Sequence, residues 1–420
     1  MNFIKKILYR FYPKLFYLIV FLVPSQLAYH FWPQYSFVYG LRIDYLAVAV
    51  YLTDILIFIY IVIFFLNSKK KSLFKKEEIL SLLVFIFFII INVFYSKQKE
   101  LSFFKWIKIL EYLIFSFTLT KSRKLTKRRT YKTFCYSILF FGGIGLLQVI
   151  RGSTLGGLFY FFGERNFNFV TPGISHLNIF NLNFLRPYST FSHPNSFAGY
   201  LLAVFIFLWF WKTKKNKNKY LKYLTISFIC ILLLLTFSKS VLFSLFIVLI
   251  SLFFNLFSKL KRIKYISLLI ILTSVLFPII SVFLLRYKNS FPDDITERLL
   301  LSVMSGQIFK TNFVLGVGLN TFISYLPKLN SLRLPFWFLQ PVHNIFLLFT
   351  VETGVVGIVI LFLAFFKYIN YLIRNNKKNF IYILLIIFIT GFFDHYWFTL
   401  QQNMVLMFLF LGLSKNKQIK

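Results

Sequence analysis

The stretch NSFAGYLLAVFIFLWFWKTKKNKNKYLK, residues 195–222, contains the pattern that decides the fold. Its apolar part, residues 195–211, carries no charged side chain and reaches the roughly 17 to 25 residues that an α-helix needs to cross a bilayer. The part that follows is crowded with lysines, which is typical of loops on the cytoplasmic side of a membrane. The stretch therefore predicts a membrane-spanning helix that ends in a cytoplasmic loop.

The whole chain has the composition of such helices. Of its 420 residues, 58% are hydrophobic and 60 are Phe, whereas only 14% are charged, and the mean hydropathy is +0.74. A soluble protein exposes too large a share of its surface to hide this much apolar material. We expect an all-α fold, a polytopic bundle of membrane helices that forms a single integral membrane domain over residues 1–420.

Length and hydropathy predict about twelve spans. The fourth is the most polar, and its Lys108 and Glu111 can pair one turn apart. The first has a basic start but no small-residue cleavage site, so we expect it to remain uncleaved. The twelve predicted spans are 14–32, 45–66, 79–95, 101–120, 131–150, 195–211, 220–236, 239–257, 264–286, 354–373, 379–393 and 399–414.

The distribution of charge predicts the topology. A net charge of +36 would suggest a nucleic-acid partner if it formed one surface, but here it is divided into short clusters between apolar segments. Lysine-rich and lysine-poor loops alternate along the chain, which places both termini in the cytoplasm. We therefore expect a protein of the cytoplasmic membrane that contacts the lipid bilayer and anionic headgroups, with no nucleic-acid partner.

Two long loops are expected on the extracytoplasmic side, at residues 151–194 and, with surface helices, at residues 287–353. Only six of the 35 lysines fall outside, against seven of the 13 arginines. The planar guanidinium binds phosphate in a bidentate way that an ammonium does not. Alternatively, the outside is simply poor in lysine because of topology. The outer arginines are Arg42, Arg151, Arg165, Arg186, Arg286, Arg298 and Arg333.

Polar side chains gather where the second half of the chain enters its spans from outside. Arg186, His193 and Asn195 precede the span at 195–211, and Asn195 is a candidate cap for that helix. Capping of the helix does not explain why an arginine stands at position 186. Lys239 stands in the short outer turn before the span at 239–257, where an ammonium must meet an anion or extend to water.

Two further clusters lie at outer helix ends. His343 and Asn344 begin an apolar helix that Glu352 and Gly354 interrupt, and a histidine in this place is either a functional group or a satisfied interfacial polar group. Asp394 and His395 form the other cluster, which we interpret as pairing or interface anchoring. All of these clusters are predicted on one side of the membrane.

The motifs RPYSTFSHPN (186–195), SK (238–239), ERL (297–299), GVGLNTF (316–322) and VHNIFLLFTVETGVVG (342–357) resemble, in this order, those of the O-antigen ligase family, which also includes O-antigen polymerases and related oligosaccharyltransferases. The resemblance implies about twelve spans, an outer loop over a cavity, and metal-free transfer of a glycan from an undecaprenyl-pyrophosphate carrier to a glycan, lipid or protein acceptor, with no cofactor.

The resemblance also implies roles for single residues. Arg186 and Arg298 match arginines that hold the carrier pyrophosphate, and His343 matches the histidine that acts on the acceptor hydroxyl. Lys239 stands where many relatives have arginine, so it keeps the charge but loses the bidentate contact. Further substrate-binding candidates are His193, Asn195, Asn344 and Glu352.

The chemistry of the residues agrees with such a transfer. Negative charge grows on the leaving pyrophosphate, which arginines stabilise, and the acceptor hydroxyl loses a proton, which a histidine can take. The outer clusters contain no convincing set of metal ligands. The alternatives are a polysaccharide polymerase, a protein oligosaccharyltransferase, and a transporter or flippase of lipid-linked sugars; a transporter predicts internal repeats and ionisable residues near the midplane.

Overall fold

The computed structural model describes residues 2–67, 76–179, 182–213, 215–253, 261–329 and 338–419. Each of the twelve predicted spans overlaps one long helix. These helices are α1 (Asn2–Leu22), α2 (Leu52–Asn67), α3 (Lys76–Tyr95), α4 (Lys99–Lys121), α5 (Lys127–Arg151), α6 (Pro194–Trp209), α7 (Asn216–Thr236), α8 (Lys239–Phe253), α9 (Lys261–Leu284), α12 (Ile345–Arg374), α13 (Lys378–Phe393) and α15 (Gln401–Lys415).

Four described helices have both the length and the hydropathy to cross a membrane, at Lys127–Arg151, Asn216–Thr236, Tyr265–Tyr287 and Ile345–Arg374. Six shorter apolar helices or helix segments, among them α2, α6, α8 and α13, accompany them. The chain is thus a helical membrane protein, and the number of twelve crossings stays a prediction.

The helix α6 forms the centre of the bundle. Every residue from Phe197 to Leu208 is at most 4% exposed, because α6 packs against α7, α8, α13 and α15. A helix that is apolar on all sides is stable where protein or lipid surrounds it, and around α6 the surroundings are protein. Its close approach to the chain after α13 requires Gly199, where a Cβ atom would come within 2.6 Å of the Tyr396 ring. The stretch that predicts a span thus provides the core.

The first span, predicted at residues 14–32, extends beyond the end of the helix that the structure contains. The helix α1 ends at Leu22, and residues 28–31 and 48–51 form the antiparallel strands β1 (Ala28–Phe31) and β4 (Val48–Tyr51). Pro24 explains the early end, since the residue before a proline disfavours the helical conformation. The strands β2 (Phe37–Val38) and β3 (Leu41–Arg42) form the tip of this hairpin. The fold is therefore not purely helical.

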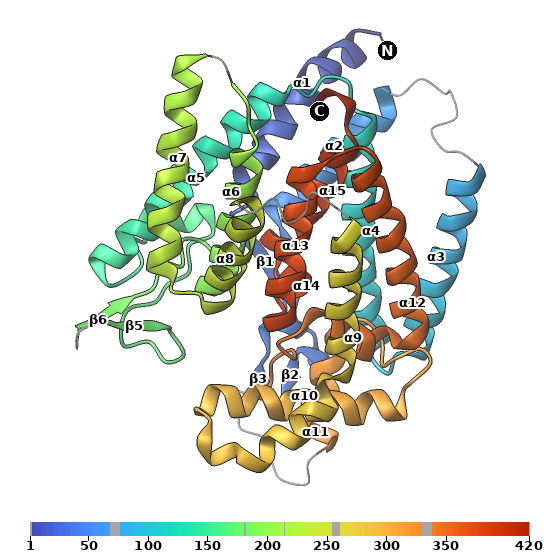
Figure 1. Ribbon diagram of the computed structural model, residues 1–420. Helices are drawn as coiled ribbons and strands as arrows, with labels where there is room; N and C mark the ends of the chain where they lie inside the picture. Colours follow the sequence, from blue (N-terminus) through green and yellow to red (C-terminus); the bar gives the residue numbers. More distant parts are fainter. Residues whose placement is uncertain are drawn as a thin grey trace.

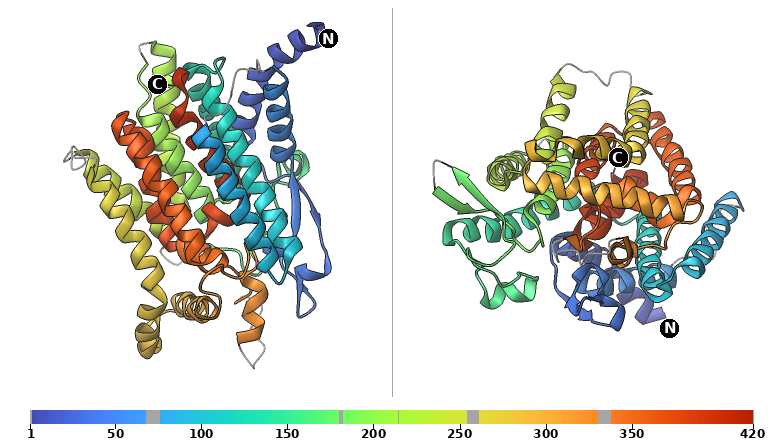
Figure 2. Two further views of the ribbon diagram at one scale, coloured as in Figure 1. Left: turned by 90° about the vertical axis from the view of Figure 1, so that its right-hand side faces the viewer. Right: turned by 90° about the horizontal axis from the view of Figure 1, so that it is seen from below.

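The predicted outer loops contain secondary structure. Residues 151–194 hold a 3-10 helix (Gly157–Phe162) and the hairpin β5 (His176–Ile179) and β6 (Leu182–Leu185). Residues 287–353 hold α10 (Asp293–Thr311) and α11 (Phe322–Leu329), while Arg333 lies outside the described residues. Figure 1 shows both termini at one end of the bundle and α10, α11, β2 and β3 at the other, with α10 lying across that end, as Figure 2 also shows.

The helix α12 begins at Ile345, before the predicted span, and is broken at Gly354 (φ 67°, ψ −170°). Backbone groups freed by this break bind the segment that follows α10: Val355 N donates to Phe313 O at 2.9 Å, and Gly318 N donates to Glu352 O at 3.0 Å. Because a Cβ atom at Gly354 would overlap the Val314 carbonyl, only glycine fits. The break predicted at Glu352 and Gly354 is confirmed, and it docks residues 313–318 onto α12.

Candidate functional site

A cavity of about 720 Å³ lies where several segments predicted to face the extracytoplasmic side meet. Its polar wall combines side chains that are far apart in the sequence: Arg165, Ser192, His193, Arg298, His343, Asp394 and His395. A second wall comes from β4, α2, α4 and α15. Of the eight site residues predicted from the sequence, His193, Arg298 and His343 line this cavity.

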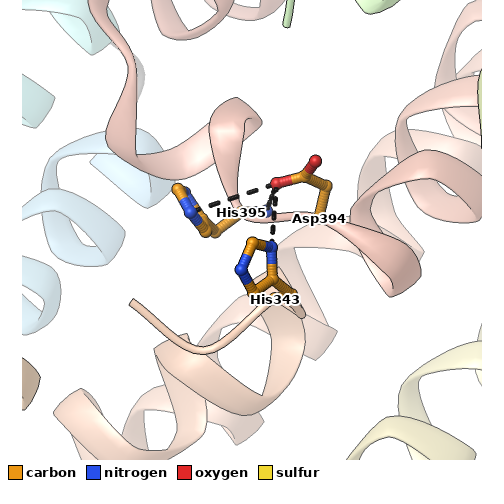
Figure 3. Close-up of side chains that lie close together, drawn as sticks. All are labelled: His343, Asp394 and His395. Atoms are coloured by element: carbon orange, nitrogen blue, oxygen red, sulfur yellow. Dashed lines mark hydrogen bonds and ion pairs between the residues drawn. The ribbon is translucent and has the colours of Figure 1, made fainter. Parts of the chain in front are cut away.

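The centre of the polar wall is the buried carboxylate of Asp394, the residue directly after α13. His343 Nδ1 lies 3.5 Å and His395 Nε2 lies 4.0 Å from the same Asp394 oxygen, Oδ1 (Figure 3). The backbone N–H of His395 donates to that oxygen at 2.8 Å, and Asn195 Nδ2 donates to Oδ2 at 3.2 Å. Asp394 is therefore held from three segments of the chain.

These surroundings decide which groups are charged. Burial alone would raise the pKa of Asp394, but the three histidines around it hold that pKa well below its usual value. Burial lowers the pKa of His395 to about 3, although Asp394 opposes the shift. Near neutral pH the cluster thus contains a carboxylate beside a neutral His395.

His343 has the orientation of a general base. Because a carboxylate only accepts hydrogen bonds, Asp394 favours, of the two neutral tautomers of His343, the one with its hydrogen on Nδ1, which lies 3.5 Å from Asp394 Oδ1. The other ring nitrogen, Nε2, is then an acceptor for a proton from a molecule in the cavity. His343 precedes α12, whose first turn is capped by Asn344: its Oδ1 accepts from the backbone N–H groups of Phe346 and Leu347, both at 3.0 Å.

His193 has the opposite orientation. It, and not Asn195, caps α6: His193 Nδ1 accepts the backbone N–H of Asn195 at 3.1 Å, so the predicted cap is wrong by two residues. The cause is Pro194, which occupies the first position of the helix and has no N–H. Burial lowers the pKa of His193 to about 4. A neutral His193 with Nδ1 occupied carries its hydrogen on Nε2 and can donate it into the cavity.

Two arginines line the polar wall from the outer loops. Arg298, on α10, donates from Nη1 to the Phe393 carbonyl at 3.1 Å, which holds α10 next to Asp394. Arg165 donates from Nη1 to the Ser192 carbonyl at 2.9 Å. Each guanidinium has five N–H donors, so donors remain for an anion in the cavity.

Arg186 lies behind this wall and is not a lining residue. It donates from Nε to the Thr236 carbonyl at 2.6 Å and from Nη2 to Asn195 Oδ1 at 2.8 Å. Since Asn195 in turn binds Asp394, Arg186 is connected to the carboxylate through one side chain. Lys239 is the exposed first residue of α8, three positions after Thr236, and does not line the cavity either.

Glu352 and Asn344 have buried positions away from the cavity. Glu352 is 2% exposed, and its Oε1 accepts the backbone N–H of Phe322 at 3.3 Å, so it joins α12 to the start of α11. Asn344 caps α12 as described above. Substrate contacts for Asn344, Glu352, Asn195 and Lys239 stay predictions.

Sequence reasoning missed several members of the site. Asp394 and His395 were interpreted as pairing or interface anchoring; Asp394 does pair with histidines, but the two residues also lie at the centre of the site. Tyr396 and Trp397 beside them are buried at 1% and 0% exposure. On α4, Lys108 pairs with Asp54 Oδ2 at 2.7 Å and not with Glu111. The charges of the fourth span were the available signal, because an apolar helix keeps charges only for a polar cavity or a partner.

His343, Asp394 and His395 also form a group that could hold a metal ion, since one ligand atom of each lies within 4.8 Å of the others. Two imidazoles and a carboxylate suit Zn²⁺ or another transition metal. The neighbouring guanidinium of Arg298 opposes a cation. The prediction of metal-free chemistry is untested by this arrangement.

An apolar bundle of long helices, with a charged cavity at one end beneath a transverse helix, is the architecture of an integral membrane protein. Residues 224–362, about a third of the chain, match the family model described as O-antigen ligase. The match supports assignment to the O-antigen ligase family and confirms the resemblance read from the motifs. The matched segment contains five of the predicted site residues: Lys239, Arg298, His343, Asn344 and Glu352. No curated protein matches the chain.

Proposed function

We propose that this protein is a glycosyltransferase that moves a glycan from an undecaprenyl-pyrophosphate carrier to an acceptor hydroxyl. The reaction takes place at the extracytoplasmic face of the cytoplasmic membrane, and both chain termini are cytoplasmic. The observation that carries the proposal is the pair His343–Asp394, with 3.5 Å between Nδ1 and Oδ1, in the same cavity as Arg298 and Arg165. A base and phosphate-binding cations are the two parts that this transfer needs.

In the proposed step the acceptor oxygen displaces the diphosphate from the anomeric carbon. The acceptor oxygen forms a bond to the anomeric carbon while its proton passes to Nε2 of His343, and Asp394 stabilises the imidazolium. The bond between the anomeric carbon and the phosphate oxygen breaks, and the electron pair leaves with the diphosphate. Arg298 and Arg165 stabilise that growing charge more in the transition state than in the bound substrate.

Arg186 has two roles in this proposal. It positions Asp394 through Asn195, since the contacts at 2.8 Å and 3.2 Å link the three side chains. Because Arg186 lies behind the cavity wall, the diphosphate contact predicted from the motif requires its guanidinium to turn into the cavity when the donor binds. Lys239 stays a candidate for a peripheral phosphate contact at the same turn. His193 donates from Nε2 to the bound glycan or phosphate.

The direct test incubates purified protein with an undecaprenyl-pyrophosphate glycan and separate candidate acceptors: lipid-linked glycan, lipid A core and a protein. Mass analysis of the product then separates ligase, polymerase and protein glycosylation. We expect one acceptor to gain the glycan while free undecaprenyl pyrophosphate appears. Movement of the donor across a vesicle membrane with no covalent product would identify a flippase and contradict the proposal.

A further inference from the structure

A buried lysine in the second wall of the cavity has no described counter-ion. Lys105, on α4, is 8% exposed and lines the cavity. Its Nζ lies 3.6 Å from the thioether sulfur of Met404 and 5.5 Å from the centre of the Phe398 ring. Within the described residues no carboxylate lies within 4.0 Å of it, although Glu352 acts on it electrostatically from farther away.

The neighbouring lysine shows the contrast. One turn along α4, Lys108 donates to Asp54 Oδ2 at 2.7 Å and to Gln401 Oε1 at 3.2 Å, and it lies over the Tyr51 ring. Lys108 is thus fully partnered by protein groups. A buried ammonium without such partners is costly, and in a cavity wall at the outer end of a membrane helix it calls for an anion from the ligand.

Beside Lys105 the cavity wall becomes apolar and reaches the surface. It is formed there by Phe104 and Ile107 of α4, each 43% exposed, and by Ile55 and Phe58 of α2, which are 50% and 62% exposed. The helices α2 and α4 pack against each other, so these four side chains form one continuous face. In a bilayer that face meets lipid, because both helices belong to predicted spans.

We propose that Lys105 binds the phosphate group of a lipid-linked ligand whose hydrocarbon chain leaves the cavity between α2 and α4, over Ile55, Phe58, Phe104 and Ile107. This rests on the proposed function and assigns the donor's place within the site. An anionic head and an apolar chain are the two properties that this wall complements. Lys105 then contacts the lipid-side phosphate, the sugar-side phosphate and the glycan extend toward Arg298 and His343, and the chain remains in the membrane.

The first test measures binding of radiolabelled undecaprenyl diphosphate to detergent-purified protein. Lys105→Met should weaken binding by about tenfold to hundredfold, the value of a charge-assisted hydrogen bond, and Lys105→Arg should restore it to within about threefold. The matched control is Lys99→Met, an exposed lysine on the same helix, which should bind like the wild type. Without ligand, Lys105→Met should melt at or above the wild-type temperature, because it removes a buried charge that has no carboxylate within 4.0 Å among the described residues.

The second test concerns the hydrocarbon chain. Ile55→Trp and Ile107→Trp narrow the apolar face and should weaken undecaprenyl diphosphate binding while leaving competition by inorganic pyrophosphate unchanged. Ile231→Trp, at an exposed position of α7 that does not line the cavity, is the control. Equal losses for both ligands would show that the chain does not follow this path.

The results separate the two proposals. If the wild-type protein forms glycosylated product while Lys105→Met keeps wild-type affinity or melts far below the wild type, the assignment of Lys105 is overturned and the proposed function stands. If the wild-type protein forms no product with any acceptor, the proposed function is overturned, and the donor subsite with it.

Discussion

His343 Nδ1 and Asp394 Oδ1 lie 3.5 Å apart, although His343 precedes α12 and Asp394 follows α13. The two helices pack against each other, which brings the start of α12 next to the end of α13. This relationship assigns the base and its orienting partner, and each can be tested separately.

Replacing His343 by Ala should lower the turnover number about 10²–10⁴-fold, because the acceptor hydroxyl loses its base. Transfer is measured by product formation from lipid-linked glycan at saturating donor. His176→Ala, in the exposed β5 strand, is the control and should act like the wild type. Normal turnover in His343→Ala would leave this histidine without a role in proton transfer.

Asp394→Asn should also lower turnover, since the amide removes the negative charge that favours a hydrogen on Nδ1 of His343. If the two residues act as a unit, the double variant with His343→Ala should be no slower than His343→Ala alone. Kinetics of the four proteins of this cycle provide the measurement. Fully multiplicative losses would mean that Asp394 works independently of His343.

Arg298→Ala should reduce turnover about 10²–10³-fold, the typical effect of one donor to a developing anion. Arg298→Lys should recover only part of it, because it keeps the charge and loses the planar set of donors. Arg286→Ala is the matched control, since Arg286 is exposed and does not line the cavity. A similar loss in Arg286→Ala would point to a general effect of surface charge.

The buried histidines predict a loss of stability in mild acid. The pKa of His193 is about 4 in the folded protein against an ordinary 6.5, so between these values the unfolded chain binds a proton that the folded chain does not. The free energy of unfolding should therefore fall as the pH decreases from 6.5 toward 4. His395 acts in the same direction.

The variant His193→Asn isolates this effect, since its side-chain oxygen can still cap α6 but cannot titrate. Thermal unfolding in detergent at pH 7.5 and pH 5 should show a smaller acid shift for His193→Asn than for the wild type. An identical shift in both proteins would assign the acid sensitivity to other groups.

Transfer should persist in excess chelator. The ligand atoms of His343, Asp394 and His395 lie within 4.8 Å of one another, so added Zn²⁺ should occupy this group and inhibit by blocking the base. Activity is measured with EDTA, and again after titration with Zn²⁺. Loss of activity in EDTA that a divalent cation restores would replace the metal-free mechanism.

Much of the fold was predictable because it is encoded locally. Each of the twelve apolar segments overlaps a helix, and the Gly354 break was visible as Glu352 and glycine inside an apolar run. The errors also have local causes. Pro24 ends α1 early, and Pro194 moves the cap of α6 from Asn195 to His193.

The candidate site was only partly predictable. The motifs indicated His343 and Arg298, which line the cavity, but they also indicated Arg186, which lies behind it and contacts Asn195. Asp394 carries no distinctive spacing relative to His343. Lys105 and Lys108 look equivalent in the sequence, one turn apart, yet only Lys108 has a carboxylate partner within the part of the chain that the structure describes.

By itself the sequence determined the class of protein, the position of its helices and the family motifs, because helix length, hydropathy and loop charge are properties of contiguous residues. Only the tertiary structure decided which polar groups share a cavity, which carboxylate lies beside His343 and which of the two α4 lysines has a carboxylate partner among the described residues. These depend on packing between helices that are distant in the chain, where the cost of burying each charge is set by neighbours that no local pattern specifies.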